Sequence, residues 1–355
     1  MATHRPLQDK VARGVMRAVG ALPPRVQRAL GGRPTRIDGQ ELHPEIQVAL
    51  RLLRLTTART FEQLPLSQGR AQISAEAWIF GDRLPVARVR DLSVPGPAGP
   101  LAARLYRPSG LDGPSALLVY YHGGGWVLGD LESADSACRF LAVHAGLSVL
   151  SIDYRLAPEN PFPASVEDAV AAFRHAARNA ESLGVDAHAI GVGGESAGGN
   201  LAAVVAQVTH AEPGPSPAFQ LMFFPVTDLS AKRPSYRLFS HGFFLTEAQM
   251  DWYRGHYLPD PTDALDPRAS PLLADTLAGL PPAYIAVAGF DPLRDEGEAY
   301  ARQLEEAGIP VTLRRHSGLV HGIINATGVG HTGRGALLEA ADALRSGLTA
   351  LAGRS

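Results

Sequence analysis

The feature that most constrains this chain is a serine between glycines at residues 194–198, which read Gly-Glu-Ser-Ala-Gly. Residues 188–193 before it are short, apolar and rich in glycine, as a buried strand can be. Residues 201–206 after it have helix propensity. A strand that turns sharply into a helix strains the residue between them, and flanking glycines let such a turn close. The pattern predicts Ser196 to be an exposed nucleophile at a strand-to-helix turn.

This stretch has two other interpretations. An ordinary glycine-rich turn stays open on the motif alone, because five-residue patterns occur by chance. A dinucleotide-binding loop fits less well, since a G-x-G-x-x-G pattern that begins at Gly191 would need glycine where Ser196 stands.

A nucleophilic serine needs donors for the oxyanion that forms during acyl transfer, and a second glycine-rich stretch can supply them. Residues 122–126 read His-Gly-Gly-Gly-Trp and follow the apolar run 116–120. Glycines allow backbone amides to face a substrate oxygen without side chains in the way. We expect the backbone amides of Gly123, Gly124 and Ala197 to form the oxyanion hole.

From about residue 76 the pattern changes from helices to strands, and from residue 116 onward strand-like and helix-like segments alternate. Repeated βα units build a mostly parallel sheet that is covered on both faces, so the predicted fold class is α/β. An antiparallel pair at 86–92 and 101–106, joined by a loop at 95–100, precedes the alternation. The predicted strands that follow are 116–121, 147–152, 188–193, 218–224, 283–288 and 311–316, and the predicted helices are 132–145, 164–181, 197–210, 293–307 and 335–351.

Two segments stand outside this alternation. Residues 1–75 contain an amphipathic helix with Val11, Val15, Met16 and Val19 at helical spacing, and a second helix that begins near residue 43 and extends to Leu55. Up to residue 40, eight Lys and Arg residues face two aspartates, which is compatible with a lipid surface but more often marks a cap with a solvated face. Residues 229–273 are rich in aromatics and prolines and interrupt the 76–355 domain between two strands. We expect both segments to cover the carboxyl ends of the strands as a helical cap.

Five motifs in this order resemble the hormone-sensitive-lipase-like esterases, also called bacterial family IV, of the α/β-hydrolase fold. They stand at residues 122–130, 153–159, 194–200, 291–297 and 321–322, and the resemblance covers about residues 75–355. It implies a carboxylic-ester hydrolase with a Ser-His-Asp triad, in which N-terminal helices cover the site. Ile323 stands where relatives often carry phenylalanine, so the shape of the acyl pocket is not implied. The side chains that we expect to bind substrate are Trp126, Phe243, Phe244 and Val320.

The order serine, acid, histidine that this fold uses narrows the search for the other two groups. His321 lies in a loop before Gly322, as the family's histidine does, whereas His316 ends a strand; His321 is the expected base. Asp291 directly follows the strand at 283–288 and is the expected acid. Asp295 is the alternative acid, although its place in the first turn of the next helix suits it to the helix dipole.

Composition excludes several partners. A net charge of −2 gives no reason to expect nucleic acid, and the single cysteine, Cys138, fits a reducing compartment and a cytoplasmic location. No apolar run is long enough to span a bilayer, so stable membrane insertion is not expected, and no secretory h-region is seen. No residues at metal-ligand spacing are found, so neither a metal nor a cofactor is expected. The oligomeric state is left open, with a homodimer among the compatible states.

The sequence therefore predicts hydrolysis of small acyl esters of short to medium chain length through an acyl-enzyme. One alternative is an amide or carbamate hydrolase that uses the same three residues. A second is a hydrolase-fold receptor that binds a small ligand without turning it over; loss of one of the three would favour it, and all three are present.

Overall fold

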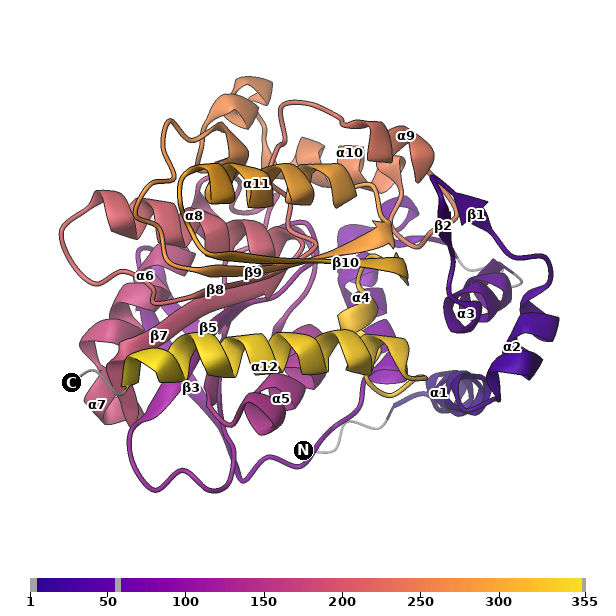
Figure 1. The fold of residues 1–355 in the computed structure, drawn as a ribbon, viewed down its shortest axis with the longest axis horizontal. Coiled ribbons are helices and arrows are strands. Elements are labelled where there is room, and N and C mark those ends of the chain that lie inside the picture. The colour runs from indigo at the N-terminus through magenta and orange to yellow at the C-terminus, as the bar shows by residue number, and fades with distance from the viewer. Residues whose placement is uncertain (1–4, 55–58, 353–355) are drawn as a thin grey trace.

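The computed structural model describes residues 5–54 and 59–352, which fold around one eight-stranded sheet (Figure 1). The strand order is β10-β9-β8-β7-β5-β6-β4-β3. Strands β5 to β10 are parallel to one another, whereas β4 pairs antiparallel with both β3 and β6. The strands are β3 (Arg88–Gly96), β4 (Gly99–Arg107), β5 (Ser115–Tyr121), β6 (Ser148–Asp153), β7 (Val185–Glu195), β8 (Gln220–Phe223), β9 (Ala283–Phe290) and β10 (Val311–Val320).

Helices cover both faces of this sheet. One face carries α5 (Leu131–Ala145) and α12 (Thr332–Ala352), and the other carries α6 (Ala164–Arg178), α8 (Ala197–Ala211) and α11 (Arg294–Glu306) (Figure 1). A short helix, α7 (Ala180–Leu183), follows α6. The central strands β8 and β9 are buried along their whole length, as expected where helices lie on both sides. Cys138 of α5 is buried in one of the two large apolar cores.

The predicted alternation of strands and helices is confirmed, with shifts at the element ends. The antiparallel pair is also confirmed, but the six-residue loop predicted at 95–100 is wrong. Pro95 pairs with Pro100 and Gly96 with Gly99, so only residues 97 and 98 lie between the strands. Pro95 is tolerated because β3 is the edge strand of the sheet, and Pro100 because the pairing of β4 with β6 begins only at Ala102, so neither missing N–H removes a bond to a further strand.

The N-terminal segment holds more helices than the hydrophobic pattern predicted. The amphipathic helix is α1 (Leu7–Gly20) and the helix after residue 43 is α3 (Pro44–Arg54), while Leu55 lies outside the described residues. Between them, α2 (Pro24–Gly31) and the two-stranded hairpin β1 (Arg36–Ile37) and β2 (Gln40–Glu41) were not predicted. A 3₁₀ turn, η1 (Phe61–Gln63), precedes α4 (Leu66–Phe80).

Helix α4 also corrects where the strand pattern begins. The sequence was expected to change from helices to strands near residue 76, but this position lies inside α4, which continues to Phe80. Ala75, Glu76 and Ala77 are good helix formers, and their propensity extends the helix past the predicted boundary.

The segment between β8 and β9 forms short helices rather than another βα unit. It contains α9 (Pro234–Leu238), α10 (Glu247–Tyr257), and the 3₁₀ turns η2 (Pro261–Leu265) and η3 (Pro271–Leu273). A fourth 3₁₀ turn, η4 (Ile323–Asn325), follows β10. Throughout residues 5–54 and 59–352, no helix combines the length and apolarity that crossing a bilayer requires.

Candidate active site

Ser196 occupies the single residue between β7 and α8. Its φ of +56° and ψ of −118° lie outside the regions that L-residues favour, so the backbone here is strained. Gly194 and Gly198 each pack against the carbonyl oxygen of Tyr121 at the end of β5, and a Cβ at either position would overlap that oxygen. Steric exclusion therefore accounts for both glycines of the Gly-Glu-Ser-Ala-Gly motif.

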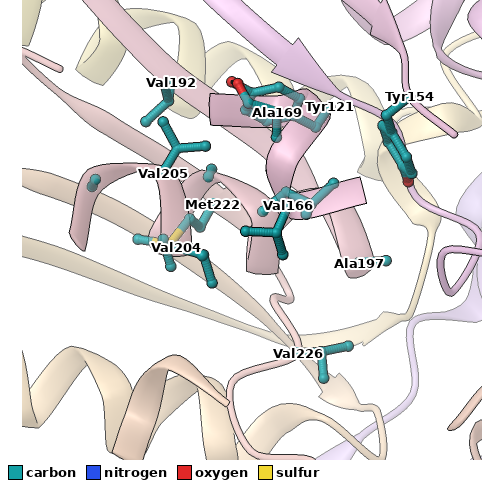
Figure 2. Close-up of a cluster of buried hydrophobic side chains, with 14 of the residues drawn as sticks. Tyr121, Tyr154, Val166, Ala169, Val192, Ala197, Val204, Val205, Met222 and Val226 are labelled. Carbon is teal, nitrogen blue, oxygen red and sulfur yellow. The ribbon is translucent and has the colours of Figure 1, made fainter. Parts of the chain in front are cut away.

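The helix that follows Ser196 is fixed by apolar packing. Figure 2 shows Val204 and Val205 of α8 among buried side chains from neighbouring elements, including Val192 of β7 and Met222 of β8. The first residue of α8, Ala197, is itself fully buried. A helix packed in this way holds the Ser196 turn in place, because a shift of the turn would disturb the core.

A chain of hydrogen bonds links Ser196 to two residues from neighbouring strands. The Nε2 of His321 lies 3.0 Å from the Oγ of Ser196, and the Nδ1 of His321 lies 2.8 Å from the Oδ2 of Asp291. Asp291 directly follows β9 and His321 directly follows β10. Since β7, β9 and β10 belong to the parallel part of the sheet, their carboxyl ends meet at one edge. The topology thus gathers three residues that are 125 positions apart in the sequence at their widest.

The surroundings of Asp291 and His321 restrict their movement. Asp291 is fully buried, and its Oδ1 accepts a hydrogen bond of 2.9 Å from the backbone amide of Leu293. The His321 ring packs against the ring of Phe224, with centroids 4.5 Å apart. Gly322, with a φ of +74°, turns the chain away directly after His321. Both side chains are therefore held in one orientation.

The two alternative residues lie elsewhere. Asp295 accepts hydrogen bonds from the backbone amide of Ser235 and from Arg294, so it ties α9 to α11. His316 lies within β10, in register with Ala288, and its buried Nε2 has no hydrogen-bond partner among the described residues. Burial lowers the pKa of His316 below that of an ordinary histidine. Neither residue makes a hydrogen bond to Ser196.

The loop after β5, residues 122–126 and called the glycine loop below, faces the start of α8. The first glycine amide of this loop, that of Gly123, already has a hydrogen-bond acceptor. The N–H of Gly123 donates to the Oε1 of Glu195 at 3.0 Å, contrary to the expectation that it is free to receive an oxyanion. The amides of Gly124 and Gly125 have no partner within the described part of the chain. That of Ala197 is likewise unpaired, as is usual in the first turn of a helix.

Glu195 fixes the shape of the glycine loop through hydrogen bonds to its carboxylate. Besides the Gly123 amide, its carboxylate accepts hydrogen bonds from the hydroxyl of Tyr120 and from the side-chain amide of Asn325 at 3.2 Å. The side chain is buried next to Ser196, and its three donors come from β5, the glycine loop and η4. Nothing in the sequence pointed to Asn325 as a donor, because it is an isolated amide far along the chain.

The segment between β8 and β9, called the cover below, packs onto the glycine loop and onto the turn that follows His321. A Cβ at Gly125 would overlap the ring of Tyr253 from α10, and a Cβ at Gly322 would come within 3.3 Å of the Phe244 ring. The N-terminal segment reaches this cover as well, because the Arg54 guanidinium donates to the carbonyl oxygen of Gly242 at 3.0 Å. Ser196 and His321 are both buried beneath these contacts.

The four side chains expected to bind substrate are not equally accessible. Trp126 is fully buried and stacks on Tyr257 with centroids 4.1 Å apart. Phe243 and Val320 pack in an apolar cluster with Phe239 and Phe290. Phe244 is 46 % exposed, which makes it the accessible member of the four. No group of three His, Cys, Asp or Glu side chains that could hold a metal occurs among the residues described.

Comparisons with known proteins agree with this architecture. A family model for the α/β-hydrolase fold matches residues 118–325. Carboxylic ester hydrolase LipN of Mycobacterium tuberculosis is 45 % identical over 98 % of this chain and 96 % of its own, and ethyl acetate hydrolase of Pseudomonas putida is 41 % identical over 68 % of this chain and 74 % of its own.

Solved structures give the same picture. The ester-hydrolase EH1AB1 from the metagenome of Lake Arreo superimposes with a TM-score of 0.84 and 44 % identity, covering 86 % of this chain and 98 % of its own. The hyperthermophilic esterase of Pyrobaculum calidifontis gives a TM-score of 0.81 with 39 % identity over the same shares. With the family model, these relatives and the shared motifs in agreement, the chain belongs to the hormone-sensitive-lipase-like carboxylesterases of the α/β-hydrolase fold.

Proposed function

We propose that this carboxylesterase works through an acyl-enzyme on Ser196, with His321 as general base and Asp291 as the group that orients the imidazole. The hydrogen-bond chain from Asp291 through His321 to Ser196, with distances of 2.8 and 3.0 Å, is the observation that carries the proposal. In acyl transfer by a serine, such a chain lets the imidazole take the hydroxyl proton as the oxygen attacks.

The reaction then has two halves. The Oγ of Ser196 adds to the ester carbonyl carbon while its proton passes to the Nε2 of His321. Collapse of the tetrahedral intermediate breaks the bond to the alcohol, which leaves with that proton. Water repeats the sequence on the acyl-enzyme, releasing the carboxylic acid and restoring Ser196. Asp291 accepts from Nδ1 throughout and stabilises the imidazolium that forms in each half.

The oxyanion donors in this proposal are the amides of Gly124 and Ala197, with Gly125 in place of the Gly123 first expected. Gly123 is supported less well because its N–H already donates to the Glu195 carboxylate. An amide that binds a carboxylate would have to give up a charge-assisted bond to receive substrate. The Gly125 amide has no such competitor among the described residues.

The substrate class is an ester with a short to medium acyl chain, with Phe244 as its first aromatic contact. Support for limited length comes from the cover over the site, where Tyr253 packs on Gly125 and Phe244 lies beside Gly322. A covered pocket has finite depth, so extra carbons must displace packed residues or stay in water. The cytoplasmic location, the lack of a nucleic-acid partner and the compatibility with a homodimer stay predictions from the sequence.

The experiment compares three kinds of acyl bond in substrates of similar chain length: an ester (p-nitrophenyl butyrate), an amide (butyryl p-nitroanilide) and a carbamate (p-nitrophenyl N-propylcarbamate). Rapid mixing with the ester should release a burst of p-nitrophenol equal to the enzyme concentration if deacylation is the slower half. The ester should have the highest kcat/KM. An anilide or carbamate that is turned over faster than the ester would replace the ester assignment by amide or carbamate hydrolysis.

A further inference from the structure

The outward face of α1 is apolar, which is the reverse of what a helix at a protein surface usually presents. Leu7, Val11 and Val15 recur at intervals of four residues and are 76 %, 57 % and 49 % exposed. The opposite face is the packed one, because Met16 and Gly20 are buried and a Cβ at Gly20 would press on Gly330. The exposed apolar stripe is therefore not the side by which α1 holds to the rest of the protein.

Helix α2 continues this apolar surface. Val26 and Leu30, also four residues apart, are 40 % and 49 % exposed. Gln27 is the buried residue of α2, and its Nε2 donates to the carbonyl oxygen of Gly20 at 3.3 Å. This bond joins the start of α2 to the end of α1, so the two helices form one unit at the edge of the molecule, indigo in Figure 1.

The same unit carries cations that the protein does not neutralise. Arg17 pairs with Asp82 and Arg36 with Glu41. None of the other six Lys and Arg residues has an ion-pair partner within the described residues. Arg5 and Arg13 lie over the Trp78 ring, whereas Lys10 of α1, Arg25 and Arg28 of α2, and Arg33 shortly after α2 are exposed. Asp9 is the acidic residue between positions 5 and 36, against eight Lys and Arg residues. Apolar and unpaired basic side chains thus share one exposed unit, called the α1–α2 face below.

We infer that the α1–α2 face docks onto an anionic lipid surface. A lipid interface accepts both kinds of side chain at once, since the apolar ones enter the boundary of the acyl chains and the basic ones meet anionic headgroups. A second copy of the chain fits less well. A two-fold contact through this face would bring the same unpaired cations together across the interface, where like charges repel.

Flotation of the full-length protein with vesicles tests this inference. One set of vesicles contains phosphatidylglycerol and phosphatidylcholine, and the other contains phosphatidylcholine alone. We expect binding to the anionic vesicles, weakening as salt is raised, and at least roughly tenfold less binding to the neutral ones. Equal binding to both, or binding to neither, would overturn the inference.

Two double variants locate the contact. Val11→Asp with Val15→Asp should lower vesicle affinity by roughly tenfold or more, and so should Lys10→Glu with Arg28→Glu. The control matched to the valine pair is Leu265→Asp with Val143→Asp, which adds the same two negative charges at exposed apolar residues on other elements and should behave like the wild type. Hydrolysis of a soluble ester should be unchanged in all three, because none of these residues touches Ser196.

Sedimentation equilibrium tests whether a second copy of the chain, rather than a lipid surface, covers the α1–α2 face. A dimer that Val11→Asp with Val15→Asp dissociates, in a protein that does not bind anionic vesicles, would assign the face to a second copy and contradict docking to lipid. A monomer that floats with anionic vesicles supports the inference.

Discussion

At the scale of single residues, the glycines and the buried carboxylates around Ser196 determine what the serine can do. Gly194 and Gly198 were predictable from the motif because only glycine allows such a turn to approach the Tyr121 carbonyl. Which amides of the glycine loop are free was not predictable. That depends on Glu195 reaching Gly123 across space, and consecutive glycines look alike in a sequence.

The choice between the two histidines gives a direct prediction. His321→Ala should reduce kcat/KM by about a thousandfold or more, since the serine then lacks its base. His316→Ala should change it little, because His316 lies within β10 without a bond to Ser196. Hydrolysis of p-nitrophenyl butyrate, with circular dichroism to check folding, measures both. The opposite ranking would move the base to His316.

Glu195 allows a prediction about positioning. Removing its carboxylate in Glu195→Ala frees the Gly123 amide and leaves the Tyr120 hydroxyl without its acceptor, so the glycine loop should shift relative to Ser196. We expect kcat to fall about tenfold or more with a smaller change in KM, because misplaced oxyanion donors weaken the transition state most. A variant with raised KM and unchanged kcat would show instead that Glu195 acts on substrate binding.

At the scale of elements, the parallel strands and their order were predictable, whereas the N-terminal helices were not fully so. Strands such as β9 are continuous apolar runs, which burial on both faces requires. Helix α2 was not predictable because its buried residue is Gln27, so its sequence has no apolar stripe that would face the core. Most residues of α4 are themselves partly buried, without a buried face and an exposed face, so its sequence lacks a clear periodic pattern.

The junction of α11 with the segment after β8 contains a carboxyl group whose protonation affects stability. Glu296 is fully buried and its Oε1 accepts from the amide of Thr227 at 2.8 Å. Burial raises the pKa of Glu296 well above its ordinary value, and the nearby Asp228 charge raises it further, while the Thr227 hydrogen bond opposes this. The folded protein therefore keeps a proton that the unfolded chain releases above about pH 4.5.

This group should make stability fall with rising pH. Glu296 contributes most below its unfolded pKa, and the contribution is lost as the pH rises toward its folded pKa, by about 1.4 kcal/mol per pH unit. The glutamine of Glu296→Gln stays neutral at every pH. The free energy of unfolding of this variant should therefore increase relative to that of the wild type as the pH rises from about 5 to 7. Urea unfolding at several pH values measures this, with the exposed Glu181→Gln as control. A difference that does not change with pH would mean that Glu296 is charged in the folded state.

At the scale of the whole molecule, the two segments outside the sheet converge on one site. Arg54 of α3 bonds to Gly242, and Tyr253 of α10 packs on Gly125 of the glycine loop. The sequence indicated that both segments form a cover, from their composition and their positions in the chain. It could not indicate which residues touch, because these contacts join segments about 190 positions apart.

Chain-length preference follows from this cover. We expect kcat/KM for p-nitrophenyl esters to rise from acetyl to about hexanoyl, since each buried methylene adds roughly 0.8 kcal/mol, and to fall at least about tenfold beyond about twelve carbons. Arg54→Ala should weaken that fall by loosening the cover, whereas the exposed Arg237→Ala should not. Equal hydrolysis of long-chain triacylglycerol emulsions and soluble butyrate esters would contradict a covered pocket.

Whether Ser196 is the nucleophile is tested most directly by one substitution. Ser196→Ala removes a single hydroxyl at a turn fixed by β7 and α8, so the fold should stay intact. We predict that its kcat/KM for p-nitrophenyl butyrate falls by about 10⁴-fold or more, while Ser182→Ala, at an exposed position in α7, keeps wild-type activity. A correctly folded Ser196→Ala protein that retains more than about a tenth of the activity would contradict the assignment.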